Sequence, residues 1–359
     1  MKGRGALSNP AGRFERRVTE PVPPDGPAEW STDWPPEEPP RLPSTTASAE
    51  RARTIISRNT SPDVPFDASI NPYRGCEHGC VYCYARPSHA YLGLSPGIDF
   101  ETRLFYKEGA AELLRRELAA PGYVCRSITI GANTDPYQPL ERERRITRSL
   151  LEILAAARHP VALITKSALI LRDRDVLAEL ARDGLVRVFV SVTTLDAALK
   201  RILEPRTASG QARLRVVEEL TSAGIPTGVL IAPVIPAIND AELETIVAAA
   251  AGAGAETVAY ILLRLPHELK ELFREWLAAH YPERADKVMA LVQDLRGGAD
   301  NDPRFGSRMT GTGPLAELLR RRFAVACRRH GLAAGERRPT RTDLFRPPAG
   351  PGGQQRLDF

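Results

Sequence analysis

Residues 76–83 read Cys76-Glu77-His78-Gly79-Cys80-Val81-Tyr82-Cys83. The cysteines stand four and three residues apart, which gathers three soft thiols in one short loop. Such a set suits iron–sulfur chemistry, and three protein ligands on a four-iron cluster leave one iron open to a further ligand. The alternative is a structural zinc site, which takes a closed set of four ligands and could borrow His78 or His89. No second Cys/His pair follows at zinc-finger or ribbon spacing, so the pattern favours iron and sulfur.

Outward from this loop, short β-branched segments alternate with amphipathic segments, which is typical of repeated βα units and a parallel sheet. We expect strands at 127–131, 161–165, 186–193, 227–232 and 257–262, with another directly before Cys76. Helices are expected at 150–157, 174–182, 211–223 and 240–251. About six such units predict an α/β fold, a partial (β/α)6 barrel, with ligands at the carboxyl ends of the strands.

The chain divides into four predicted parts. Residues 1–67 are rich in proline and predict a largely extended arm. Residues 68–266 form the barrel, 267–332 a helical C-terminal extension, and 333–359 a flexible tail with a glycine–proline linker.

No apolar run approaches the roughly 20 residues of a membrane span, so we expect a cytoplasmic protein without a membrane partner. The net charge of +5 is too small to establish nucleic-acid binding.

The C-x3-C-x2-C pattern with Tyr82 before its last cysteine resembles the radical S-adenosylmethionine (SAM) superfamily. Further segments resemble its spore photoproduct lyase group, which repairs a thymine lesion in DNA. These segments are Tyr82-Cys83-Tyr84, Thr134-Asp135, Ile164-Thr165-Lys166, Phe189-Val190-Ser191, Glu204-Pro205-Arg206-Thr207, Arg213-Leu214 and Val229-Leu230-Ile231-Ala232-Pro233. The resemblance spans about residues 69–266 and implies a [4Fe-4S] cluster, SAM, and reductive cleavage of SAM to a 5′-deoxyadenosyl radical that removes a hydrogen atom from the substrate.

The resemblance also implies roles for individual residues. Cys76, Cys80 and Cys83 would bind the cluster. The predicted SAM-binding residues comprise Lys166 and Ser191 for the carboxylate or ribose, Thr134 and Asp135 for the amino group, Ala232 beside the adenine, and also Tyr82 and Arg206. Each has an ordinary alternative: Lys166 as a solvated strand-end lysine, Ser191 as a helix cap, Asp135 as a turn former.

One departure concerns the hydrogen donor. The lyase group has a cysteine directly before its Thr-Asp-like element, and this chain has Asn133 there. An amide supplies no weak S–H bond, although Tyr82 and Tyr84 match the two tyrosines of the group. Tyr82, Tyr84 and Asn133 are therefore the candidate catalytic residues. Cys125 lies a strand's length upstream, near the opposite end of the barrel, and we interpret it, like Cys327, as a structural thiol.

Two features indicate further partners. Gln354, Leu357 and Phe359 resemble a peptide that docks into the bacterial sliding clamp, against the alternative of a tail without a partner. A basic segment could bind phosphates or form a solvated face; its residues are Arg320, Arg321, Arg322, Arg328 and Arg329.

The predicted function is radical chemistry on a nucleic-acid or nucleotide substrate, with a reductant such as flavodoxin or ferredoxin. Alternatives are radical modification of a protein, tRNA or metabolite, and a non-enzymatic zinc or iron–sulfur module.

Overall fold

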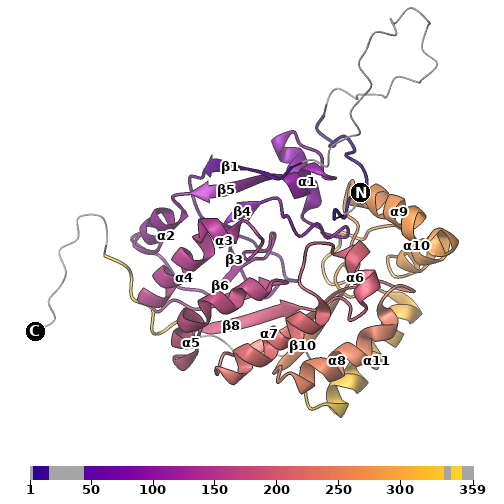
Figure 1. The fold of residues 1–359 in the computed structure, drawn as a ribbon. Helices are drawn as coiled ribbons and strands as arrows, with labels where there is room; N and C mark the ends of the chain where they lie inside the picture. The colour runs from indigo at the N-terminus through magenta and orange to yellow at the C-terminus, as the bar shows by residue number, and fades with distance from the viewer. Residues whose placement is uncertain (1–2, 16–43, 335–340, 350–359) are drawn as a thin grey trace, which may run out of the picture.

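The computed structural model describes residues 3–15, 44–334 and 341–349. Its elements form an α/β structure in which helices surround a mostly parallel sheet (Figure 1). None of the helices in these residues has the combined length and apolar character that a membrane crossing requires. The predicted clamp-binding residues Gln354, Leu357 and Phe359 lie outside the described residues.

The main sheet has eight strands in the order β11-β10-β9-β8-β7-β6-β3-β2. The strands are β2 Ile56–Arg58, β3 Ala68–Ile70, β6 Ile128–Ile130, β7 Val161–Thr165, β8 Val186–Ser191, β9 Thr227–Val234, β10 Thr257–Leu262 and β11 Ala333–Ala334. All neighbours pair in parallel except β2, which runs antiparallel to β3 at one edge. The two edge strands, β2 and β11, do not pair with each other in the described residues, so the sheet is open there. The predicted α/β class with a parallel sheet is confirmed.

A second, smaller sheet is formed by strands from the first part of the chain (Figure 1). In it, β1 Thr46–Arg51 runs parallel to β5 Arg103–Glu108, and β4 Tyr73–Arg74 pairs antiparallel with β5. The strand expected directly before Cys76 is therefore β4, which belongs to this smaller sheet, whereas the main sheet enters earlier through β3. Both β1 and β2 come from the segment predicted to be an extended arm.

The helices that follow the strands cover the outer face of the main sheet (Figure 1). They are α2 Ala110–Leu118, α4 Ile146–Ala156, α5 Arg174–Arg182, α7 Gly210–Ser222 and α8 Leu243–Gly252, with α11 Gly313–Arg329 packed beside α8. Shorter elements are α1 Asp99–Thr102, α3 Glu141–Arg144, α6 Ala197–Leu203, η1 Arg86–Leu92, η2 Ala168–Asp173, η3 Asp240–Glu242 and η4 Pro282–Arg284. Helices α9 Leu269–His280 and α10 Ala285–Asp294 complete the C-terminal part.

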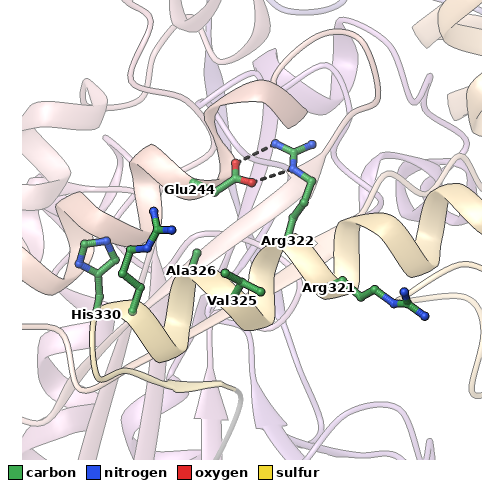
Figure 2. A pocket seen from close by; sticks show the side chains of 7 residues that line it. Glu244, Arg321, Arg322, Val325, Ala326 and His330 are labelled. Atoms are coloured by element: carbon green, nitrogen blue, oxygen red, sulfur yellow. Dashed lines mark hydrogen bonds and ion pairs between the residues drawn. The ribbon is translucent and has the colours of Figure 1, made fainter.

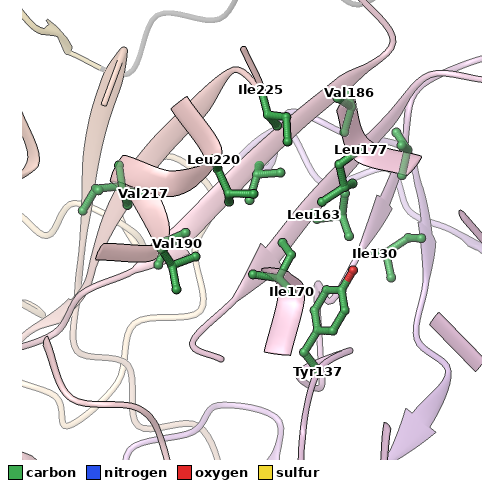
Figure 3. Packing of buried hydrophobic residues seen from close by; sticks show 14 of the residues in the cluster. Ile130, Tyr137, Leu163, Ile170, Leu177, Val186, Val190, Val217, Leu220 and Ile225 are labelled. Atoms are coloured by element: carbon green, nitrogen blue, oxygen red, sulfur yellow. The ribbon is translucent and has the colours of Figure 1, made fainter. Parts of the chain in front are cut away.

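The core lies between the main sheet and these helices (Figure 3). Leu163 of β7 and Val190 of β8 face Leu177 of α5 and Leu220 of α7, and all four side chains are fully buried. Strands buried on both faces read as continuous apolar runs, and helices as apolar residues at three- and four-residue spacing. The sequence shows both of these patterns. Because the strands run parallel, their carboxyl ends lie at one common edge of the sheet.

Candidate active site

Residues 76–83 form the cysteine loop, which follows β4 at the carboxyl edge of the sheet. Cys76 and Cys80 are buried, and Cys83 is half-buried. The backbone N–H of Cys76 donates to the Phe100 carbonyl at 2.9 Å, and that of Cys83 donates to the Cys80 carbonyl at 3.3 Å. Gly79 has a φ of 68°, in the region that favours glycine. The loop is thus held tightly by backbone contacts that leave the three thiols unused.

The three thiols lie close enough to influence one another. Burial raises the pKa of Cys76, and Asp135, Cys80 and Cys83 raise it further. Burial likewise raises the pKa of Cys80, to about 12, with Glu204 as the next cause. None of the three forms a disulfide. Buried thiols that stay protonated by themselves become thiolates when a bound metal supplies the positive charge. The loop therefore fits a group that brings its own cations.

The spacing of these ligands bears on the kind of group. Among the described residues, no three His, Cys, Asp or Glu side chains are gathered as ligands of a single metal ion. In a four-iron cluster each thiolate binds a different iron, so three cysteines need not converge on one point. The donor set fits an iron–sulfur cluster, for which Cys76, Cys80 and Cys83 are the available ligands.

Asp135 joins the loop after β6 to the end of β7 and to the cysteine loop. One carboxylate oxygen accepts from the Thr165 hydroxyl at 2.7 Å, and the other from the Lys166 backbone N–H at 2.7 Å. His78 Nδ1 lies 3.3 Å from the same carboxylate. Burial would raise the pKa of Asp135, but His78 and these hydrogen bonds outweigh it and hold that pKa below its usual range. Asp135 thus has its partners inside the protein.

A second buried carboxylate organises the opposite side of the loop. Glu204 accepts hydrogen bonds from Thr193 at 2.8 Å, from the Tyr82 hydroxyl and from the Arg213 guanidinium. Lys166 Nζ lies 3.5 Å from Glu204 Oε1. Burial would raise the pKa of Glu204, but Arg213 and Lys166 hold it well below its usual range. We call these five residues, Tyr82, Lys166, Thr193, Glu204 and Arg213, the Glu204 cluster.

Lys166 is the partly exposed cation of the Glu204 cluster. Its side chain is 16% exposed, and its Nζ donates to the Ala232 carbonyl at 3.3 Å. Its positive charge lowers the pKa of both Cys80 and Cys83, although burial dominates in each thiol. A cation with one carboxylate partner and residual exposure can turn to an incoming anion at this edge of the sheet.

The structure brings some of the predicted site residues together and separates others. Ser191 is buried at the end of β8, where its carbonyl accepts from Arg213 at 2.9 Å. Thr134 donates its hydroxyl to the Tyr73 carbonyl at 2.8 Å, so it is used inside the fold. Arg206 pairs with Glu77 of the cysteine loop, and no contact joins its side chain to the Glu204 cluster among the interactions of the described residues.

The three predicted catalytic residues have different surroundings. Tyr82 is buried and tied to Glu204. Tyr84 is 48% exposed, and its hydroxyl donates to the Ala132 carbonyl. Asn133 is half-buried, and its backbone N–H donates to Asn71 Oδ1 at 2.8 Å. Tyr84 and Asn133 therefore lie in neighbouring segments at the edge of the main sheet where its parallel strands end, which we call the mouth of the sheet.

Glu204 and Arg213 belong to a motif of the sequence but had no predicted role. Thr193, at the end of a predicted strand, and Gln138 were not predicted as site residues. The Gln138 side chain accepts from the Glu77 N–H at 3.0 Å and donates to the Gly75 carbonyl at 3.2 Å. The Glu204-Pro205-Arg206-Thr207 segment, followed by Arg213, was the available signal, because a Glu and an Arg nine residues apart can pair across a helix start.

The predicted basic helix is α11, whose surface carries a separate hollow of about 350 Å³ (Figure 2). Arg322 binds Glu244 of α8 through two contacts of 2.7 Å. Arg320 and Arg321 both pair with Glu317. Much of the positive charge on this face is therefore already neutralised by neighbouring carboxylates.

Three comparisons place this chain among known proteins. The family model of the radical SAM superfamily matches residues 70–250. An uncharacterized protein of Mycobacterium tuberculosis is 35% identical over 278 residues, which cover 77% of this chain and 78% of that protein. An uncharacterized protein of Methanocaldococcus jannaschii is 27% identical over 173 residues, covering 48% of this chain and 62% of that protein.

Solved structures of spore photoproduct lyase share the fold. The complex of that lyase with dinucleoside spore photoproduct has a TM-score of 0.56 at 15% identity, covering 80% of both chains. A mutant of it with bound AdoMet and the same dinucleoside has a TM-score of 0.53 at 14% identity, covering 83% of this chain and 86% of the other. With the cysteine loop, the parallel sheet and the family match, the chain belongs to the radical SAM superfamily, whose enzymes use a [4Fe-4S] cluster and S-adenosylmethionine.

Proposed function

We propose that this radical SAM enzyme acts on a nucleic-acid or nucleotide substrate at the edge of the sheet formed by the cysteine loop and the Glu204 cluster. The observation that supports the position of this site is the placement of three free, mutually interacting thiols beside Lys166 at the carboxyl ends of the strands. Cys76, Cys80 and Cys83 hold the cluster in this proposal. When bound, the cluster supplies an electron from an external reductant such as flavodoxin or ferredoxin for the cleavage of SAM.

The chain's own residues then bind and orient SAM. Lys166 provides a cation for the methionine carboxylate or a donor for the ribose, and Ser191 provides a hydroxyl one strand away. The Ala232 carbonyl, which Lys166 contacts at 3.3 Å, lines the adenine side. Because both oxygens of Asp135 accept internal hydrogen bonds, we assign Asp135 to positioning the Lys166 backbone and Thr134 to holding the adjacent loop.

Glu204 has a positioning role in this proposal. It contacts Tyr82 in the cysteine loop and Lys166 after β7, and it is fully buried. A fixed carboxylate between these two residues sets the distance between the cluster ligands and the cation for SAM. Arg213 balances its charge, so that Lys166 stays available to an incoming anion.

The substrate class rests on the shared fold with a lyase whose solved complex holds a dinucleoside. The proposed reaction nevertheless differs from that of the lyase group in its last hydrogen transfer, since Asn133 has no S–H bond to offer. Tyr84, exposed next to Asn133, is the residue that we propose for contact with the substrate radical.

Deuterium transfer tests the substrate class directly. The reconstituted enzyme, SAM and reductant are incubated with oligonucleotides deuterated in the sugar and the thymine methyl group, and 5′-deoxyadenosine is examined by mass spectrometry. We expect deuterium in the 5′-deoxyadenosine. Deuterium transferred instead from a labelled peptide, tRNA or metabolite pool, with none from the oligonucleotides, would reject the proposal in favour of that substrate.

A further inference from the structure

Arg264 lies two residues beyond the end of β10, at the same edge of the sheet as the cysteine loop. Its guanidinium carbon is 5.7 Å from the centre of the Tyr84 ring. Its Nη1 is 3.8 Å from the sulfur of Met309, and its Nε is buried without a hydrogen-bond partner. The charged end of this half-buried side chain therefore contacts a ring and a thioether.

Two fully buried arginines in the described residues have carboxylate partners. Arg86 pairs with Glu101, and Arg213 pairs with Glu204. Arg296 has no carboxylate partner and an unpartnered Nε, but its terminal nitrogens donate to the carbonyls of Leu262, Leu263, Ser307 and Arg308. No carboxylate of the described residues forms such a pair with Arg264. A guanidinium removed from water without an anion is costly, unless a ligand supplies the anion.

Burial lowers the pKa of Arg264, and the neighbouring Arg308 lowers it further. Arg308 is itself bound to Asp63 and Ser61. The charge of Asp63 acts on Arg264 in the opposite direction, but burial and Arg308 outweigh it, so an anionic group of the substrate would stabilise the Arg264 guanidinium.

Tyr84 adds an aromatic surface to the same site. Its hydroxyl donates to the Ala132 carbonyl after β6, while its ring faces Arg264 after β10. The tyrosine thus reaches across the mouth of the open sheet, directly beside Cys83, with 48% of its surface exposed. An exposed ring beside an arginine is the pair of groups that binds an unstacked base and its phosphate in single-stranded nucleic acids.

We propose that Arg264 and Tyr84 form a nucleotide-recognition site, in which Arg264 binds a backbone phosphate and the Tyr84 ring stacks on the adjacent base. This inference deepens the proposed function and rests on its nucleic-acid substrate. It assigns recognition to the mouth of the sheet, beside the cluster ligands, and not to the basic face of α11, where three arginines already pair with carboxylates: Arg320 and Arg321 with Glu317, and Arg322 with Glu244.

Binding of a fluorescein-labelled single-stranded DNA oligonucleotide to the reconstituted enzyme tests the site, measured by fluorescence anisotropy over a range of salt concentrations. We expect Arg264→Gln to weaken binding about tenfold and to reduce the slope of log K against log salt by about 0.7, the share of one phosphate contact on a single strand. Arg264→Lys retains the charge and hence the slope. Tyr84→Ala weakens binding about tenfold, whereas Tyr84→Phe retains the ring and the affinity.

Arg329→Gln is the matched control, because Arg329 is an exposed arginine in the hollow on α11. It leaves affinity and slope unchanged if the site is at the mouth. If Arg329→Gln weakens binding and Arg264→Gln does not, the inference is wrong and the nucleic-acid proposal stands. If the unaltered enzyme binds no oligonucleotide, both fail. If Arg264→Gln weakens binding of SAM and not of the oligonucleotide, the anion at Arg264 is the SAM carboxylate and the inference is again overturned.

Discussion

Glu204→Gln is the substitution that probes the interior of the site most sharply. Glu204 and Arg213 are 0% and 1% exposed in their side chains, and each is the other's main charge partner. The change keeps the size of the side chain but leaves the Arg213 guanidinium buried without a counter-ion. Breaking a buried pair in this way costs about 3–5 kcal/mol. We therefore expect the free energy of unfolding to fall by about that amount.

Urea unfolding of the reconstituted enzyme, followed by circular dichroism under anaerobic conditions, measures this loss. The matched control is Glu268→Gln, which breaks a 2.9 Å pair with Arg13 near the surface and should cost no more than about 1 kcal/mol. Arg213→Met should cost less in the Glu204→Gln background than in the native chain, because the two residues are coupled. A Glu204→Gln protein as stable as the Glu268→Gln control would refute the central role given to this carboxylate.

Three further outcomes are expected. Lys166→Ala should raise the Kd for SAM about tenfold, the share of one charge-assisted hydrogen bond, with unchanged iron content; equal SAM affinity would contradict the proposed role of Lys166. Gly5→Ala should destabilise the N-terminal segment and expose it to proteolysis, because a Cβ there would lie 1.7 Å from the Gly79 carbonyl oxygen; Gly252→Ala, with open space around its Cβ, is the control and should leave proteolysis unchanged. Burial lowers the pKa of His159 to about 4, so its contribution to stability is present above about 6.5 and is lost as pH falls toward 4; His159→Asn should remove this loss, and an identical pH profile for both proteins would argue against it.

The regular elements of the barrel were largely predictable because they depend on local patterns. The expected strands 161–165 and 257–262 coincide with β7 and β10, and the expected helix 174–182 coincides with α5. The expected strand 186–193 ends earlier, at Ser191, because the Thr193 side chain turns to Glu204. Strand β9 continues to Val234, past the predicted end, because the Leu263 N–H still donates to the Val234 carbonyl.

The parts that could not be predicted depend on distant contacts. Tyr82 and Glu204 stand 122 residues apart in sequence, and no local pattern announces that they meet. The N-terminal segment docks through the backbone N–H groups of Gly5 and Ala6, which donate to Glu101 at 3.1 and 2.8 Å. Backbone donors leave no trace in side-chain periodicity, so a proline-rich segment offered no sign of this contact. The three thiols, by contrast, lie within eight residues of sequence, so their spacing alone predicts that they meet.

The central claim is that the cysteine loop and Lys166 form a site that cleaves SAM. Its most direct test is anaerobic reconstitution with iron and sulfide, reduction in the presence of SAM, and chromatography for 5′-deoxyadenosine, with Cys80→Ala as the control that lacks one ligand. We predict 5′-deoxyadenosine from the unaltered protein and none from the Cys80→Ala protein. A fully loaded cluster that never cleaves SAM, or equal product from both proteins, would contradict the account.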